Sequence, residues 1–111
     1  MDRPTSILWT ERASADIESI VRYIARRDPS AAGRIGRGIY GRAQILLEQP
    51  GAGSILDELR EDGWRKLVHR RWMIIYTVRG GAVIVGRVWP AAMGEADLET
   101  PLDDGEDPPA P

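Results

Sequence analysis

The sequence contains no cysteine, one histidine (His69) and one lysine (Lys66). Without cysteine the chain forms neither a disulfide nor a thiolate metal site, and a single histidine argues against a zinc site. We therefore expect no metal and no cofactor. No apolar run approaches the roughly 20 residues needed to span a bilayer, and no apolar signal-peptide core follows Met1. We expect a cytoplasmic protein with no membrane partner.

Charge is distributed unevenly along the 111 residues. Residues 1–94 hold all 15 basic side chains and 10 acidic ones, a balance of +5, whereas residues 95–111 hold 7 acidic side chains and no basic one. Segments rich in acidic residues and proline, with little apolar surface, do not order themselves. The sequence predicts one folded domain over residues 1–94 and an acidic, Pro-rich disordered tail over 95–111.

The stretch from Trp64 to Trp89 is the strongest structural signal. It is rich in Val, Ile, Tyr and Trp, which suit a pleated, half-buried surface. Gly80-Gly81 separates two such runs and is typical of a two-residue hairpin turn, because both positions tolerate positive φ. We expect three antiparallel strands at about 64–69, 72–79 and 82–89, with a second turn at residues 69–71.

Alternation along the last strand predicts two faces. Side chains of successive strand residues point to opposite sides of a sheet. One set is the better core face: Ala82, Ile84, Gly86 and Val88. The other set is Val83, Val85, Arg87 and Trp89, which we expect on a partly open, basic and aromatic face suited to binding a partner.

Two amphipathic helices are expected before this sheet. Ser6–Trp9 reads as an edge strand, and Thr10 or Ser14 is suited to cap the first helix. The first helix ends near residues 26–27, and the second starts with Asp28 as N-cap and Pro29 at its first position. The expected core residues are Ile17, Ile20, Ile24, Ile39, Leu46, Ile84 and Val88. The second helix ends near Glu48, before the break at residues 49–53.

This order of elements resembles the ParE/RelE toxins of bacterial type II toxin–antitoxin systems. The residues that carry the match are 15–24, which are similar to the first helix of the ParE branch, and 47–53, 59–67, 72–78 and 84–89. The resemblance covers roughly residues 5–93. It implies an α+β fold with an N-terminal strand, an antiparallel helical hairpin and a three-stranded antiparallel meander packed against the helices.

The resemblance also implies a toxin neutralised by a cognate, ParD-like antitoxin. The ParE branch is associated with inhibition of DNA gyrase, and the RelE branch with ribosome-dependent mRNA cleavage. Fold alone does not decide between them. The C-terminal end, Trp89–Gly94, offers no Tyr or His, and tryptophan cannot serve as acid or base at neutral pH. This favours a non-catalytic gyrase inhibitor, with a RelE-like mRNA endonuclease acting on the ribosome as the alternative.

Candidate site residues follow from these two functions. For a nuclease, the cations that hold the phosphate would be Arg65, Lys66, Arg71 and Arg87. For target binding, the candidates are Arg65, Arg71, Arg87 and Trp89. For antitoxin binding, the candidates are Ile17, Tyr23, Arg34 and Arg37.

Each candidate also has a purely structural interpretation. Arg65 and Arg87 are equally suited to pair with a loop carboxylate such as Asp57, Glu58 or Glu61, whereas Trp89 and Trp64 are better suited to core or rim packing than to target contact. Tyr76 reads as a core residue with a satisfied hydroxyl, His69 as a solvated turn residue with a lowered pKa beside two arginines, and Asp16 and Glu18 as solvated helix positions. Plain nucleic-acid binding is a third function, but +5 is a weak basic footprint for it.

Overall fold

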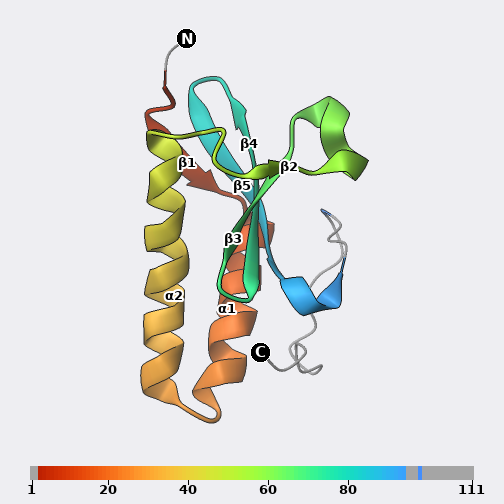
Figure 1. Cartoon of the computed structure of the whole chain (residues 1–111). Helices are drawn as coiled ribbons and strands as arrows, with labels where there is room; N and C mark the ends of the chain where they lie inside the picture. Colours follow the sequence, from red (N-terminus) through yellow and green to blue (C-terminus); the bar gives the residue numbers. More distant parts are fainter. Residues whose placement is uncertain (1–2, 95–97, 99–111) are drawn as a thin grey trace.

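The computed structural model describes residues 3–94 and Leu98. Its five-stranded sheet has the order β1-β5-β4-β3-β2 (Figure 1). The strands are β1 (Ser6–Trp9), β2 (Ser54–Ile55), β3 (Arg65–His69), β4 (Trp72–Arg79) and β5 (Ala82–Pro90). β1 pairs with β5 in parallel, and the remaining pairs are antiparallel. The expected α+β fold, with an N-terminal strand, a helical hairpin and a meander, is confirmed.

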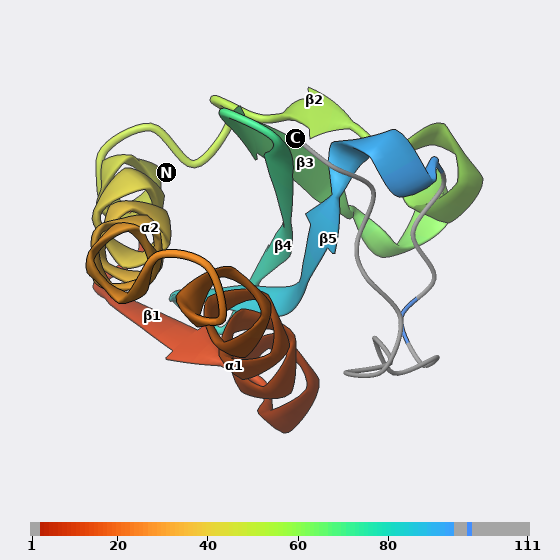
Figure 2. The same cartoon turned by 90° about the horizontal axis from the view of Figure 1, so that it is seen from below.

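Both helices begin as their capping residues predict. The Thr10 hydroxyl accepts a hydrogen bond from the Ala13 N–H at the start of α1 (Glu11–Ala25), and the Asp28 carboxylate caps α2 (Pro29–Ala43). A 3-10 turn, η1 (Gln44–Leu47), extends α2. Figure 2 shows the two helices packed side by side against one face of the curved sheet.

The main core lies between the helical hairpin and the sheet. Its buried side chains come from both helices, from η1 and from three strands: Ala13, Ile17, Ile20, Ile39, Ala43, Leu46, Leu67, Trp72, Ile74, Tyr76, Val83, Val85 and Val88. Among the described residues, no helix is long and apolar enough to cross a membrane.

The expected facing of β5 is wrong for its first half. Val83 and Val85 are fully buried in the main core, whereas Ile84 is only partly buried. Tyr76 pairs with Val85 but Ile75 pairs with Arg87, so Gly86 is an extra residue in β5. Such a β-bulge shifts the alternation by one residue, and Val88 therefore faces the core as expected. A Cβ at Gly86 would lie 2.8 Å from the Trp64 ring, which leaves room only for glycine.

The opposite sheet face is not the open surface that the alternation predicts. A second apolar cluster occupies it, formed by Leu56, Trp64, Met73, Ile75 and Trp89. Leu59, from the irregular helix η2 (Asp57–Asp62), and Leu98 pack against this cluster. β4 is apolar in both phases, so each of its faces requires a cover. The predicted tail, apart from Leu98, lies outside the described residues.

Candidate functional site

Arg87 is fully buried and paired with Asp16 on α1. Its Nε and Nη2 donate to the two carboxylate oxygens of Asp16 at 2.8 and 2.7 Å. The Val88 N–H donates to the same carboxylate at 3.0 Å. Both side chains are at most 1% exposed, and the guanidinium stacks over the Trp89 ring at 4.5 Å. A buried charge is tolerated only when it is paired and hydrogen-bonded in this way.

The Arg87–Asp16 pair lies beside the end of β1. The last β1 residue, Trp9, pairs with Val85, and Thr10 then donates its N–H to the Val85 carbonyl and its hydroxyl to the Gly86 carbonyl. The chain turns into α1 at this point, so among the described residues no strand pairs with the second half of β5 on this side. Asp16 takes the place of that strand, because its carboxylate accepts the Val88 N–H as a neighbouring strand carbonyl would.

Three placements expected from the sequence are therefore corrected. Arg87 and Trp89 do not lie on an open face, and Asp16 is not solvated. Arg87 pairs with the helical Asp16, and among the described residues it does not pair with the loop carboxylates Asp57, Glu58 or Glu61. The sequence held a signal for this: Asp16 lies three residues after Ala13 and four before Ile20, on the buried stripe of α1, where a carboxylate requires a cationic partner.

A second polar cluster fixes the loop between η1 and β2. The Tyr76 hydroxyl accepts the Gly53 N–H at 2.9 Å and donates to the Pro50 carbonyl at 2.7 Å. Arg65 donates to the Gly53 carbonyl at 2.7 Å, so its partner is this loop and not a carboxylate. Burial raises the pKa of Tyr76, which keeps its hydroxyl protonated as a donor. Tyr76 is thus a core residue with a satisfied hydroxyl, as the sequence predicts.

Replacing Tyr76 with phenylalanine is expected to lower the free energy of unfolding by about 1–3 kcal/mol, because the Gly53 N–H and the Pro50 carbonyl lose their partner. Urea denaturation measures this loss. The matched control is Tyr40→Phe, since Tyr40 is 42% exposed, and its effect should stay within about 0.5 kcal/mol. Equal losses in the two variants would show that the hydroxyl does not hold the loop.

The four cations proposed for a nuclease do not gather on one face. Arg65 pairs with Tyr76 and Lys66 with Ile75, so these neighbours in β3 point to opposite sides of the sheet. Arg71 is exposed in the β3–β4 turn, and Arg87 is enclosed by Asp16 and Trp89. Of these four side chains, only Arg71 is fully available to a partner.

The residues expected to bind an antitoxin also divide by exposure. Arg34 and Arg37 are exposed on α2, and Tyr23 on α1 is partly exposed, with Arg27 5.9 Å from its ring centroid. Ile17 is 4% exposed and belongs to the main core. Ile17 is therefore a core residue, as the apolar stripe of the first helix predicts, and not the exposed antitoxin contact that was also expected of it.

Comparison with known proteins bears on the class of this domain. The family model described as "ParE toxin of type II toxin-antitoxin system, parDE" matches residues 7–94. The chain belongs to the ParE toxin family. It is the toxin component of a type II toxin–antitoxin system, which implies a cognate antitoxin as its partner.

One known protein and one solved structure are similar to this ParE-family toxin. A protein named Toxin RelE1 from Caulobacter vibrioides is 26% identical over 84 residues, which are 76% of this chain and 90% of the relative. A solved structure titled "Chromosomal ParDE TA system from P. aeruginosa" superposes with a TM-score of 0.68 at 23% identity. The superposition covers 78% of this chain and 95% of that one, and it shows a shared fold.

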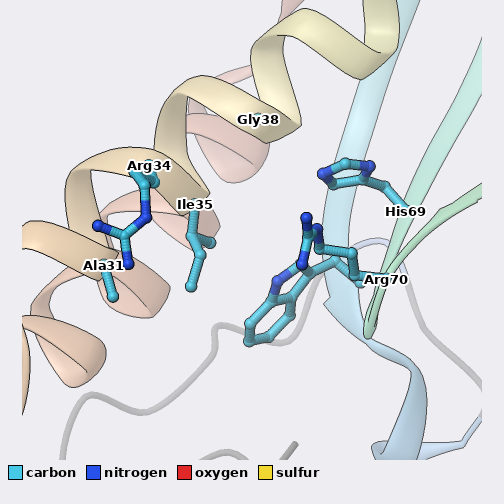
Figure 3. A pocket seen from close by; sticks show the side chains of 7 residues that line it. Ala31, Arg34, Ile35, Gly38, His69 and Arg70 are labelled. Atoms are coloured by element: carbon cyan, nitrogen blue, oxygen red, sulfur yellow. The ribbon is translucent and has the colours of Figure 1, made fainter.

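On the helical side, the ParE-family toxin has a pocket of about 280 Å³ between α2 and the β3–β4 turn (Figure 3). Ala31, Arg34, Ile35 and Gly38 form one wall, and His69, Arg70 and Trp72 form the other. His69 lies against the helix backbone, since a Cβ at Gly38 would be 3.1 Å from its Nε2.

The pocket keeps its histidine neutral. Partial burial, together with the nearby Arg70 and Arg42 charges, lowers the pKa of His69. The expected direction of this shift is confirmed, but burial is its largest cause. The contact of His69 with α2 was not predicted, because Gly38 and His69 lie 31 positions apart in the chain and carry no local signal of contact.

Proposed function

We propose that this ParE-family toxin inhibits DNA gyrase by binding it, and that its cognate antitoxin covers the helical hairpin. The observation that carries the proposal is the pairing of Arg87 with Asp16 at 2.7 and 2.8 Å in the protein interior. The one arginine on the last strand, which a phosphate-holding site would require, is already occupied. The binding function needs no such group.

Proton transfer gives independent support. Cleavage through a ribose 2′-hydroxyl requires a general base and a general acid within hydrogen-bond reach of the reacting atoms. Among the described residues, the Tyr76 hydroxyl is committed to Gly53 and Pro50, and Trp89 has no proton to exchange at neutral pH. His69 lies in the helix-side pocket and not on the sheet face with Lys66.

A RelE-like mRNA endonuclease is the second candidate, and the name of the Caulobacter relative, Toxin RelE1, favours it. Exposed Arg71 and partly exposed Arg65 and Lys66 would supply its cations. Positioned cations stabilise a phosphorane-like transition state. The second candidate therefore predicts cleavage that depends on these three side chains.

Parallel assays of purified toxin distinguish the two functions. We expect loss of gyrase supercoiling at toxin concentrations comparable to those of the enzyme, with mRNA left intact on translating ribosomes in toe-printing. Arg71→Ala should weaken gyrase inhibition, because Arg71 is exposed, and Arg79→Ala at the far end of β4 is the matched control. New cuts at the ribosomal A site that disappear in Arg71→Ala, together with normal supercoiling, would overturn gyrase inhibition and support the nuclease function.

The same supercoiling assay tests the antitoxin surface. Adding the cognate antitoxin should restore supercoiling, and Arg34→Glu together with Arg37→Glu should reduce this rescue, because both side chains lie exposed on α2. An amphipathic antitoxin helix is suited to the hairpin, and an extended segment to the outer edge of β1. Unchanged rescue of the double variant would exclude α2 from the antitoxin surface.

A further inference from the structure

The pocket between α2 and the β3–β4 turn is surrounded by positive charge. From Pro29 to Leu47 the sequence has three arginines and no carboxylate, and the turn adds Arg70 and Arg71. Arg34 donates to Ser30 on its own helix at 3.2 Å. Within the described part of the chain, neither Arg34 nor Arg70 has an ion-pair partner.

The shape of the pocket suits an extended acidic peptide. Ile35 and Trp72 provide apolar contact for the stem of a side chain, while Arg34 and Arg70 stand on opposite walls and can meet a carboxylate from two directions. Arginine is the side chain best matched to such contacts, because its planar fork binds carboxylates in pairs of hydrogen bonds.

The chain leaves its last strand beside this pocket. Pro90 at the end of β5 pairs with Trp72, and the Ala91 N–H donates to the Arg71 carbonyl at 2.8 Å. Residues 99–107 follow shortly afterwards and include five carboxylates, four of them within residues 103–107: Asp103, Asp104, Glu106 and Asp107. The most acidic segment of the sequence therefore begins nine residues after the strand end that lies beside this basic pocket.

We propose that the acidic segment 99–107 of this chain docks into the pocket between α2 and the β3–β4 turn, with its carboxylates facing Arg34 and Arg70. Leu98 sets the starting point, since it packs against the second apolar cluster on the other sheet face. Nine residues span up to about 30 Å when extended, about the width of a small domain, so the segment reaches around the end of the sheet.

Because the acidic segment is part of the same chain, weak ion pairs with the pocket are sufficient for it to dock. A short linker raises the effective concentration of the segment to the millimolar range, so that even exposed ion pairs populate the docked state at low salt. The docked segment would neutralise the basic α2 surface, and any acidic partner that binds there must first displace it. The inference concerns the isolated toxin and does not depend on the cellular target.

His69 provides a direct reporter, because it is the only histidine of the chain. The groups that face it are Arg70 and Arg42, which lower its pKa, and Arg34 across the pocket. A docked carboxylate would oppose these arginines and raise the pKa of His69. The test variant is the full chain with Asp103→Asn, Asp104→Asn, Glu106→Gln and Asp107→Asn.

NMR of the full-length protein and this variant at low salt decides the proposal. We expect amide shifts at the pocket residues Ala31, Gly38 and Arg70, and a lower pKa of His69 in the variant. In a protein that carries Arg34→Gln and Arg70→Gln, neutralising the acidic segment should no longer shift the amides of Ala31 and Gly38. In the matched control Arg79→Gln, neutralising the segment should still shift them. High salt should reproduce the effect of neutralising the segment, because the contacts are exposed and screened.

Two results would overturn the proposal. Unchanged pocket amides and an unchanged pKa of His69 would show that the segment does not dock. Shifts confined to Trp64, Met73 and Trp89 would place the segment on the opposite sheet face. Neither result requires gyrase or antitoxin, so the failure of this inference is distinguishable from failure of the proposed function.

Discussion

Replacing Asp16 with alanine is expected to lower the free energy of unfolding by about 3–5 kcal/mol, because it removes the carboxylate that pairs with the buried Arg87 guanidinium. The substitution also removes the acceptor of the Val88 N–H. In the described part of the chain no strand pairs with this half of β5 on the α1 side, so no strand carbonyl there replaces the lost acceptor. Urea denaturation of the purified toxin measures the loss.

The matched control for this substitution is Glu18→Ala. Glu18 lies on the same helix but is exposed, 3.8 Å from Arg22 in a surface pair, and such pairs contribute about 0–1 kcal/mol. Asp16→Leu combined with Arg87→Met should recover part of the loss, because apolar replacements remove both buried charges. A loss below about 1 kcal/mol for Asp16→Ala would mean that water reaches Arg87.

Replacing Ile20 with alanine is expected to cost about 2–5 kcal/mol, through lost transfer free energy and the cavity that remains. Ile20 is fully buried between α1 and the sheet. The matched control is Ile84→Ala, the same change at a partly buried isoleucine outside the main core. Its expected loss is about 1 kcal/mol.

The pair of substitutions also tests the strand phase. If Ile84→Ala destabilised the protein as much as Ile20→Ala, Ile84 would be a core residue as the uninterrupted alternation of β5 predicts. A loss below about 1 kcal/mol for Ile20→Ala would place the apolar stripe of α1 in contact with solvent.

Elements with local signals were predictable from the sequence. Thr10, Asp28 and Pro29 mark the helix starts, and Gly80 and Gly81 take positive φ of 57° and 77° in the hairpin turn. These features depend on neighbouring residues, so the pattern of the chain contains them. The order of elements then gave the fold through its resemblance to ParE/RelE toxins.

The site was less predictable because its contacts are distant in the chain. Asp16 and Arg87 are 71 positions apart, and the bulge at Gly86 depends on Trp64, which belongs to another element. A period of two residues cannot reveal an inserted residue, so the alternation assigned Val83, Ile84 and Val85 to the wrong faces. Arg87 and Trp89 were assigned to the correct face, but that face carries a second apolar cluster against which Leu59 and Leu98 pack. The carboxylate within the stripe of α1 was the available clue.

The first two elements of the chain, β1 and α1, depend for their contacts on the last strand, β5. Within residues 3–94, β1 pairs only with β5, and Asp16 of α1 requires Arg87 and Val88 before its charge is satisfied. Domains tend to fold as units as synthesis proceeds from the N-terminus, and contacts between distant positions form late because a long loop must close first. A ribosome making this chain therefore holds the toxin unfinished until residue 88 has emerged.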